Sequence, residues 1–207
     1  MNKLKDPIEY GIVIPKEVNN LINKFDSTIK IKIEDTSKLL AQAPIHNSKI
    51  IVLSRGFFNE HKNIKFITND ILVIVAHELG HIVLKSHFVK LFWISFICIA
   101  ISSICIIISL LCLSMKDFFY NSFSLMLFLL YLGYISRNEE IRADKFAILK
   151  ANVSIEEFTQ CFSKIETVLE KEDNRKNIFI SSINKTFFNF HPEIKQRILT
   201  VQSLTKK

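Results

Sequence analysis

The longest uncharged stretch of the chain constrains its fold more than any other feature. Residues 91–115 contain no charged side chain, and these 25 residues exceed the roughly 20 apolar residues that a helix needs to cross a bilayer. A second stretch, 118–136, has 19 residues and carries Asn121, so it is weaker alone. The two predict a transmembrane hairpin with its turn near Lys116 and Asp117. The alternative is a buried hairpin in a soluble protein.

The charges beside the hairpin predict its orientation. No apolar run resembling a signal peptide follows Met1, so we expect the polar parts to stay in the compartment where they are made. Basic residues flank the hairpin on its polar side, whereas the far turn offers only one lysine beside one aspartate. These flanking residues are Lys85, Lys90, Arg137 and Arg142. The positive-inside rule therefore places both polar parts in the cytoplasm.

Composition excludes several classes of protein. The net charge of +7 lies in the two polar parts, where anionic lipid would attract it. No basic run alternates with aromatic residues, which argues against nucleic acid as a partner. Cys161 stands alone and no C-x-x-C pair exists, so neither a disulfide scaffold nor a thiolate zinc site is expected. The abundance of Ile, Lys, Asn and Phe, with few Gly and Pro, indicates an AT-rich bacterial genome.

Small residues form a stripe along the first apolar stretch. Their spacing of three and four residues places them on one helix face, where another helix can approach closely. The stripe consists of Ser95, Cys98, Ser102, Cys105, Ser109 and Cys112. It predicts a packing seam with the second apolar helix or with another copy of the chain.

The polar parts read as a mixture of strands and helices. Alternating isoleucines predict a strand at 29–33, and "KIIVLSRG" predicts another at 49–56. The proline in "AQAPIHN" between them suits a loop or an edge strand. A helix that is apolar all round, and therefore buried, should run from about Asp70 to beyond His81.

That buried helix carries a metal-binding pattern. His77 and His81 are four residues apart, so both imidazoles lie on one helix face and can hold one ion. Neutral imidazole suits zinc, and Glu78 stands where its carboxylate can reach an attacking water. Two histidines and a glutamate in an apolar helix are expensive to bury without such a partner.

A catalytic zinc needs a third protein ligand, and three candidates exist. His87 has the spacing of a metzincin, but Leu84 stands where that pattern needs a glycine. A continuing helix would carry His87 about 9 Å beyond His81 along the axis. Glu140 is the better candidate, because Asp144 one turn on can accept the N–H of a ligand histidine. Glu139 would place an alanine in that supporting position.

The motifs resemble those of HtpX and the CAAX prenyl proteases, a family of integral-membrane zinc metallopeptidases. "AHELGH", an apolar hairpin, "SRNEEIRADKFA" and "FHPEIKQRI" follow in the family's order over about residues 40–200. The family's E-x-x-x-D motif matches Glu140 and Asp144. HtpX proteins carry further membrane helices before the metal helix, so this chain resembles a reduced version.

The resemblance implies an α+β, mostly helical fold. It consists of a zincin-like core with a small N-terminal sheet and an inserted two-helix transmembrane hairpin. Residues 1–90 and 137–207 would form the two halves of the core, and 91–136 the hairpin. A homo-oligomer through the stripe of small residues would be possible, and the enzyme would be a multi-pass protein of the cell membrane with its site on the cytoplasmic side.

The implied activity is that of a zinc metalloendopeptidase acting on membrane-associated proteins or peptides. One zinc per chain would be held by His77, His81 and Glu140, with Glu78 as general base. His191 or Arg197, in the "HP…RI" segment, would steady the oxyanion or position the substrate. A substrate strand would pair with the edge formed by Gln42, Ala43, Pro44 and Ile45. The alternative function is a non-proteolytic zinc-binding membrane sensor or scaffold.

Overall fold

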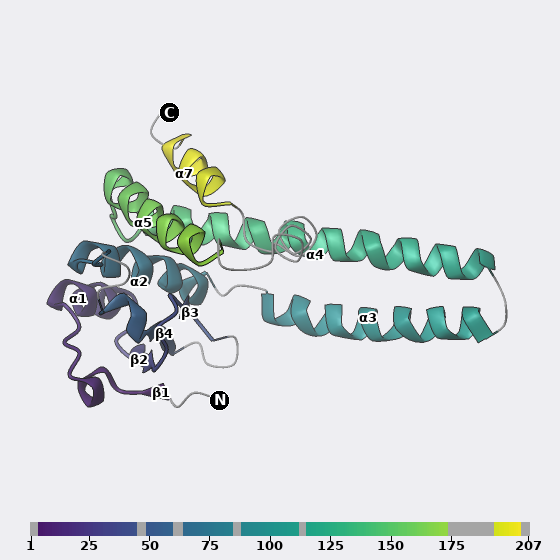
Figure 1. Cartoon of the computed structure of the whole chain (residues 1–207), viewed down its shortest axis with the longest axis horizontal. Coiled ribbons are helices and arrows are strands. Elements are labelled where there is room, and N and C mark those ends of the chain that lie inside the picture. Colours follow the sequence, from purple (N-terminus) through teal and green to yellow (C-terminus); the bar gives the residue numbers. More distant parts are fainter. Residues whose placement is uncertain are drawn as a thin grey trace.

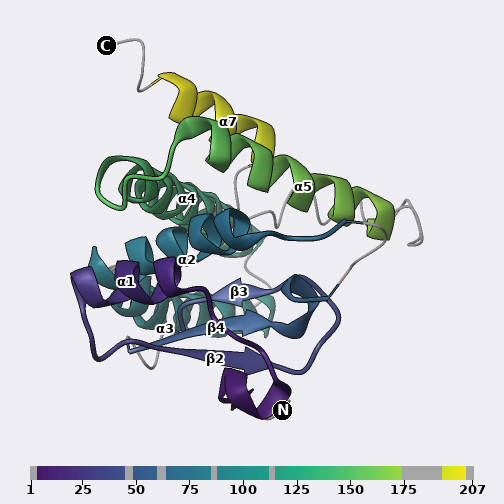
Figure 2. The ribbon, with the colours of Figure 1, turned by 90° about the vertical axis from the view of Figure 1, so that its left-hand side faces the viewer.

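The computed structural model describes residues 4–44, 49–59, 64–84, 88–111, 115–173 and 193–203. Most of these residues are helical, and a compact part carries a long helical hairpin that projects to one side (Figure 1). The compact part is layered: a small sheet lies beneath helices α1 and α2, and helices α4, α5 and α7 lie above them (Figure 2).

The sheet has four strands in the order β1-β2-β4-β3. Strand β2 (Lys30–Glu34) runs parallel to β4 (Ile50–Ser54), while the short strands β1 (Leu4–Lys5) and β3 (Ala41–Gln42) pair antiparallel at the two edges. The predicted strands at 29–33 and 49–56 are confirmed in outline, and "AQAP" supplies an edge strand. Strand β1 carries too little pattern in two residues to be predicted.

Helix α2 (Thr68–Val83) is the central element of the compact part. Its residues 73–80 are all buried, as the absence of a polar face predicted. Asp70 starts the helix by accepting a hydrogen bond from the N–H of Ile67 at 2.7 Å, and it also pairs with Lys164 Nζ at 2.7 Å. Helix α1 (Lys16–Phe25) packs beside α2 and buries the one apolar face that contains Val18, Leu21 and Ile22.

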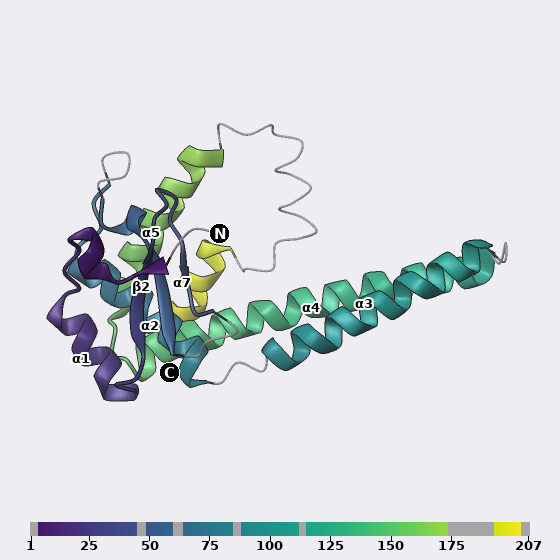
Figure 3. The same cartoon turned by 90° about the horizontal axis from the view of Figure 1, so that it is seen from below.

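The hairpin consists of α3 (Phe88–Leu111) and α4 (Met115–Leu149), which lie side by side (Figure 3). Cys98, Ser102 and Cys105 are half-buried, whereas Ile97 and Ile101 beside them are more than half exposed. The described part of the small-residue stripe therefore faces α4, the first of the two predicted packing partners. Cys112 lies outside the described residues.

Helix α4 does not stop where the apolar stretch ends. The second predicted membrane segment ends at Ser136, but the structure has a single helix of 35 residues, about 52 Å long. No proline or glycine lies between Ser136 and Glu140 to break it. Among the described residues, Phe118–Leu149 is the helix long and apolar enough to cross a membrane, and Phe96–Ile108 is a shorter apolar helix. That both helices cross a membrane stays a prediction.

The last helices close the core from above. Helix α5 (Ile155–Asp173) begins with a capping box in which Ser154 and Glu157 bond each other's backbone N–H at 3.1 Å. Helix α7 (Ile194–Gln202) packs on both α4 and α5. Phe146 and Phe158 from these later helices share one apolar core with Ile31. The parts before and after the hairpin therefore fold around a common core.

Candidate metal centre

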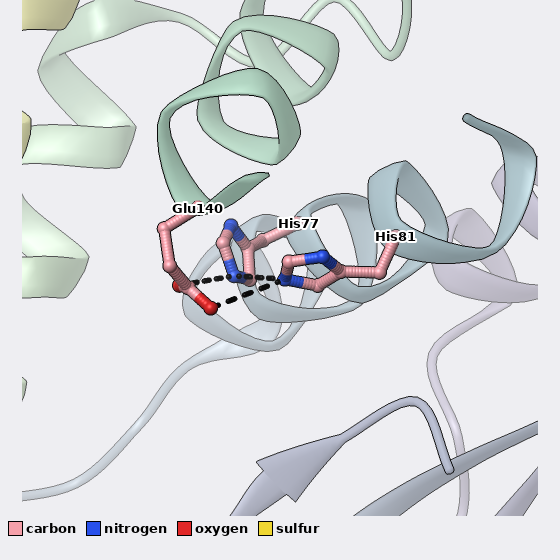
Figure 4. Close-up of side chains that lie close together, drawn as sticks. All are labelled: His77, His81 and Glu140. Atoms are coloured by element: carbon pink, nitrogen blue, oxygen red, sulfur yellow. Dashed lines mark hydrogen bonds and ion pairs between the residues drawn. The ribbon is translucent and has the colours of Figure 1, made fainter. Parts of the chain in front are cut away.

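Two histidines of α2 face the same point above the helix. His77 and His81 are one helical turn apart, and their Nε2 atoms lie 3.2 Å from each other. The rings stand edge to face with centroids 4.8 Å apart, so they do not stack on each other, and both Nε2 atoms are directed to one place. Figure 4 shows the two rings converging on a carboxylate from another helix.

That carboxylate belongs to Glu140 of α4. Its Oε2 atom lies 3.3 Å from His77 Nε2, and its Oε1 atom lies 3.5 Å from His81 Nε2. Zinc bonds of 2.0–2.1 Å in a tetrahedron place neighbouring donor atoms about 3.3 Å apart. The two histidines approach different oxygens of Glu140, and the three donor groups lie close enough together to hold a single metal ion. Among the described residues, His77, His81 and Glu140 form a group that could hold a metal ion.

Gly80 explains how α4 comes close enough to α2 for Glu140 to reach the two histidines. A Cβ atom at Gly80 would lie 2.9 Å from the Cα of Ala143 and 3.0 Å from its carbonyl oxygen. The first distance is shorter than real Cβ contacts and the second is tighter than nine in ten of them, so α2 and α4 can approach this closely because Gly80 has no side chain. No motif in the sequence indicates this contact.

Behind His77, a carboxylate and a guanidinium complete the centre. Asp144 is 1% exposed, and its Oδ1 atom lies 2.9 Å from His77 Nδ1. Arg197 of α7 binds the same carboxylate through two bonds, from Nε at 2.9 Å and from Nη2 at 2.6 Å. With Nε2 of His77 directed at the metal position, Nδ1 carries the hydrogen and donates it to Asp144.

Glu78 lies beside the donor set but is not part of it. Its side chain is buried, and burial raises the pKa of its carboxyl group, with the charge of Glu140 adding to the effect. The backbone N–H of Ala43, just after strand β3, donates a hydrogen bond to this carboxylate. A carboxyl group whose pKa is raised holds a proton more readily, which suits a group that must take up and release one.

The charges of the centre favour a divalent cation. Among the described residues, the centre holds three buried carboxyl groups, those of Glu78, Glu140 and Asp144, and the guanidinium of Arg197 pairs with the last two. The excess negative charge acts on His77: burial and Arg197 lower its pKa, but hydrogen bonds to Asp144 and Glu140 prevail and raise the pKa to about 9. The positive charge of a zinc ion would compensate the excess negative charge of the centre more fully than that proton does.

His81 and Asp144 respond in the opposite direction. Burial, followed by the charge of His77, lowers the pKa of His81 to about 4, so this ring is neutral and ready to bind a metal. Burial would raise the pKa of Asp144, but its hydrogen bonds with Arg197 and His77 outweigh that and lower it. Asp144 is therefore an ionised acceptor for the N–H of His77.

The structure brings most of the predicted site residues together. His77, Glu78, His81, Glu140 and Asp144 form one cluster, and Arg197 joins it from α7. Glu139 lies outside it and instead pairs with Arg142 at 2.6 Å. Phe162, whose ring lies 4.3 Å from the Arg197 guanidinium carbon, was not selected from the sequence. Three candidates lie outside the described residues: Ile45, His87 and His191.

Comparison with known proteins agrees with this geometry. The model of Peptidase family M48 matches residues 29–205, which is most of the chain. The chain belongs to this family, that of HtpX and the CAAX proteases, whose members are zinc metallopeptidases. The predicted resemblance is therefore confirmed. No curated protein and no solved structure gave a significant match.

Proposed function

We propose that the protein is a membrane-bound zinc metalloendopeptidase that hydrolyses peptide bonds of membrane-associated proteins or peptides. One observation carries this function: donor atoms from two helices, His77 and His81 on α2 and Glu140 on α4, lie within 4.8 Å of one another with Glu78 beside them. A structural zinc site would need a fourth protein ligand. Among the described residues the candidate group has three donors, which is the arrangement of a catalytic site.

The residues of the chain divide the work between them. His77, His81 and Glu140 would hold a zinc ion, which would supply a Lewis acid for polarising the scissile carbonyl and activating water. Glu78 accepts the proton of the attacking water and delivers it to the leaving amine. His191 remains our candidate for steadying the oxyanion, since a cationic or N–H donor is needed there.

The outer edge of β3, which is the last strand of the sheet among the described residues, supports the proposed place for the substrate. Leu40 faces β4, because its carbonyl oxygen accepts the N–H of the opposite residue Ser54 at 2.8 Å. In an antiparallel pair the next residue, Ala41, directs its N–H and C=O away from the partner strand. A substrate strand could pair with these groups, in line with the N–H of Ala43 that reaches Glu78. Pro44 has no N–H, so it could offer a substrate only its carbonyl.

The hairpin supports the membrane assignment. Only 6% of the most apolar window in Phe118–Leu149 is buried, whereas the core helix of a soluble protein would be mostly buried. Exposed side chains cover the outside of both helices, among them Ile97, Ile101, Ile104, Phe123, Leu127 and Leu130. Lys116 and Arg137 are 21 residues apart in one helix, about 31 Å, which matches the bilayer core.

Membrane insertion would place the metal centre at the bilayer surface. Arg137 marks the end of the proposed span, and its Nε bonds the carbonyl of Gly133 one turn back at 3.1 Å. Glu140 follows three residues later, which is less than 5 Å further along the helix axis. Substrates would then be cut close to the membrane, on the cytoplasmic side if the positive-inside rule holds.

Replacing Glu78 by glutamine tests this function. The detergent-solubilised wild-type protein should cleave an unfolded protein such as casein, and Glu78→Gln should abolish cleavage while retaining zinc, because the amide cannot accept the proton of the water. Glu139→Gln, which alters the neighbour of a ligand, is the matched control and should remain active. Cleavage that survives in Glu78→Gln would contradict the mechanism. A wild type that binds zinc but cleaves neither casein nor any membrane protein would favour a sensor or scaffold.

A further inference from the structure

Arg197 is the one arginine or lysine buried among the carboxylates of the metal centre in the described part of the chain. It is 8% exposed, and its guanidinium carbon lies 4.3 Å from the ring centroid of Phe162 on α5. Besides its two bonds to Asp144, Nη1 lies 3.5 Å from Glu140 Oε2. Arg197 therefore touches both acidic residues that α4 contributes, while the Phe162 ring covers its face.

Two donors meet at one oxygen of Asp144. His77 Nδ1 lies 2.9 Å from Oδ1, and Arg197 Nη2 lies 2.6 Å from the same atom. The two nitrogens are consequently only 3.1 Å apart, a separation that a shared acceptor explains without a bond between them. The second carboxylate oxygen, Oδ2, accepts the Nε–H of Arg197 at 2.9 Å.

This arrangement fixes the orientation of the Asp144 carboxylate. A planar guanidinium that binds both oxygens holds the carboxylate plane in its own plane, which a point charge cannot do. The oxygen presented to His77 then sets the direction of the imidazole ring and keeps the hydrogen on Nδ1. Nε2 is left as the nitrogen that faces the metal position.

We propose that Arg197 is a positioning residue of the metal centre, which acts through Asp144 to hold His77, rather than a residue that contacts the substrate. The inference rests on the proposed zinc site. It also makes helix α7 part of that site, because α7 contributes no donor atom to the predicted metal group but anchors the residue that supports one.

Zinc affinity separates this role from a substrate-binding role. Loss of a residue that supports a metal ligand typically weakens metal binding 10- to 100-fold. We expect Arg197→Met to lose zinc affinity by about this factor. Arg197→Lys should have an affinity between those of Arg197→Met and the wild type, since lysine can bind one oxygen of Asp144 but not both. A residue that only steadies the oxyanion would leave zinc affinity unchanged and lower kcat at saturating zinc.

The experiment measures zinc dissociation constants of the full-length protein in detergent by competition with a chelator. Lys164→Met is the matched control: it breaks another ion pair, with Asp70 at 2.7 Å, which is partly buried and joins α5 to α2 away from the donor atoms. Unchanged zinc affinity in this control would show that loss of an ion pair between helices does not by itself weaken the site. The visible spectrum of bound Co²⁺ reports the ligand geometry and should change in Arg197→Lys but not in Lys164→Met.

A double-mutant cycle tests whether Arg197 acts through Asp144. Asp144→Asn alone should weaken zinc binding. The total loss of zinc affinity in the double variant with Arg197→Met should be much smaller than the product of the two separate losses. Wild-type affinity and spectrum in Arg197→Lys, or full multiplicative effects in the double variant, would overturn the inference. A wild-type protein that binds no zinc would instead refute the proposed function itself.

Discussion

At the scale of single residues, the metal centre depends on a residue without a side chain. Gly80 lies between the two histidines of α2, at the point where the backbone of Ala143 crosses. The same close contact allows Glu140, nearly one turn earlier on α4, to reach both imidazoles. Packing of this kind cannot be deduced from one sequence, because Gly80 reads equally well as a tolerated glycine within a helix.

Gly80→Ala should therefore damage the metal centre without removing any ligand. The new methyl group would push α4 away by the backbone of Ala143, costing about 1–3 kcal/mol in unfolding free energy and moving Glu140 out of position. Gly11→Ala is the control: Gly11 has a φ of +66° but no atom near its Cβ position, so it should cost stability and leave zinc binding unchanged. Chemical denaturation and zinc titration measure the two effects. Normal zinc affinity in Gly80→Ala would show that the close contact is not required.

The ligands themselves were more accessible to prediction than their supports. His77 and His81 follow from spacing on one helix, and Glu140 was preferred to Glu139 because Asp144 stands one turn on. Both inferences use contacts within a single helix, where geometry is fixed by the backbone. The contact of Arg197 with Asp144 joins residues 53 positions apart, so the sequence suggested a charged residue near the site but not which group it holds.

At the scale of elements, α4 is one rod with two environments. Its first part exposes apolar side chains, and its last part enters the core with Ala143, Phe146 and Ala147. Hydropathy alone suggested a break at the charged residues near 137. A helix continues, however, as long as no residue interrupts its backbone hydrogen bonds, and a change from apolar to charged side chains does not do so. The consequence is a rigid connection between the proposed membrane span and Glu140.

Charges on the exposed face of this rod test the membrane assignment. Phe123→Arg should oppose insertion by about 2.5–3.5 kcal/mol, because Phe123 is 57% exposed on the apolar part of α4 and would face lipid. Leu199→Arg is the control, since Leu199 is also exposed but lies on α7. The measurement is the fraction of protein that resists alkaline extraction from membranes. Release of the wild-type protein by alkali would contradict the transmembrane hairpin.

At the scale of the whole molecule, the hairpin is an insertion between two parts of one core. The metal helix precedes its apolar part, Glu140 follows that part on α4, and the shared core brings His77 Nε2 and Glu140 Oε2 to 3.3 Å from each other. The inserted hairpin and the strands of the sheet can be predicted from the sequence because local patterns of hydrophobicity indicate both. It could not show how α5 and α7 stack over α2, since those contacts depend on packing between distant segments.

Zinc binding by the ligand variants tests most directly the claim that the centre closes across the hairpin. After dialysis against a weak chelator, the wild type should retain about one zinc ion per chain, as expected for a site with three protein ligands. Glu140→Gln should lose it, whereas Glu139→Gln and His87→Ala should retain it. If His87→Ala loses zinc and Glu140→Gln retains it, all the ligands lie before the hairpin in the sequence, and the account is wrong.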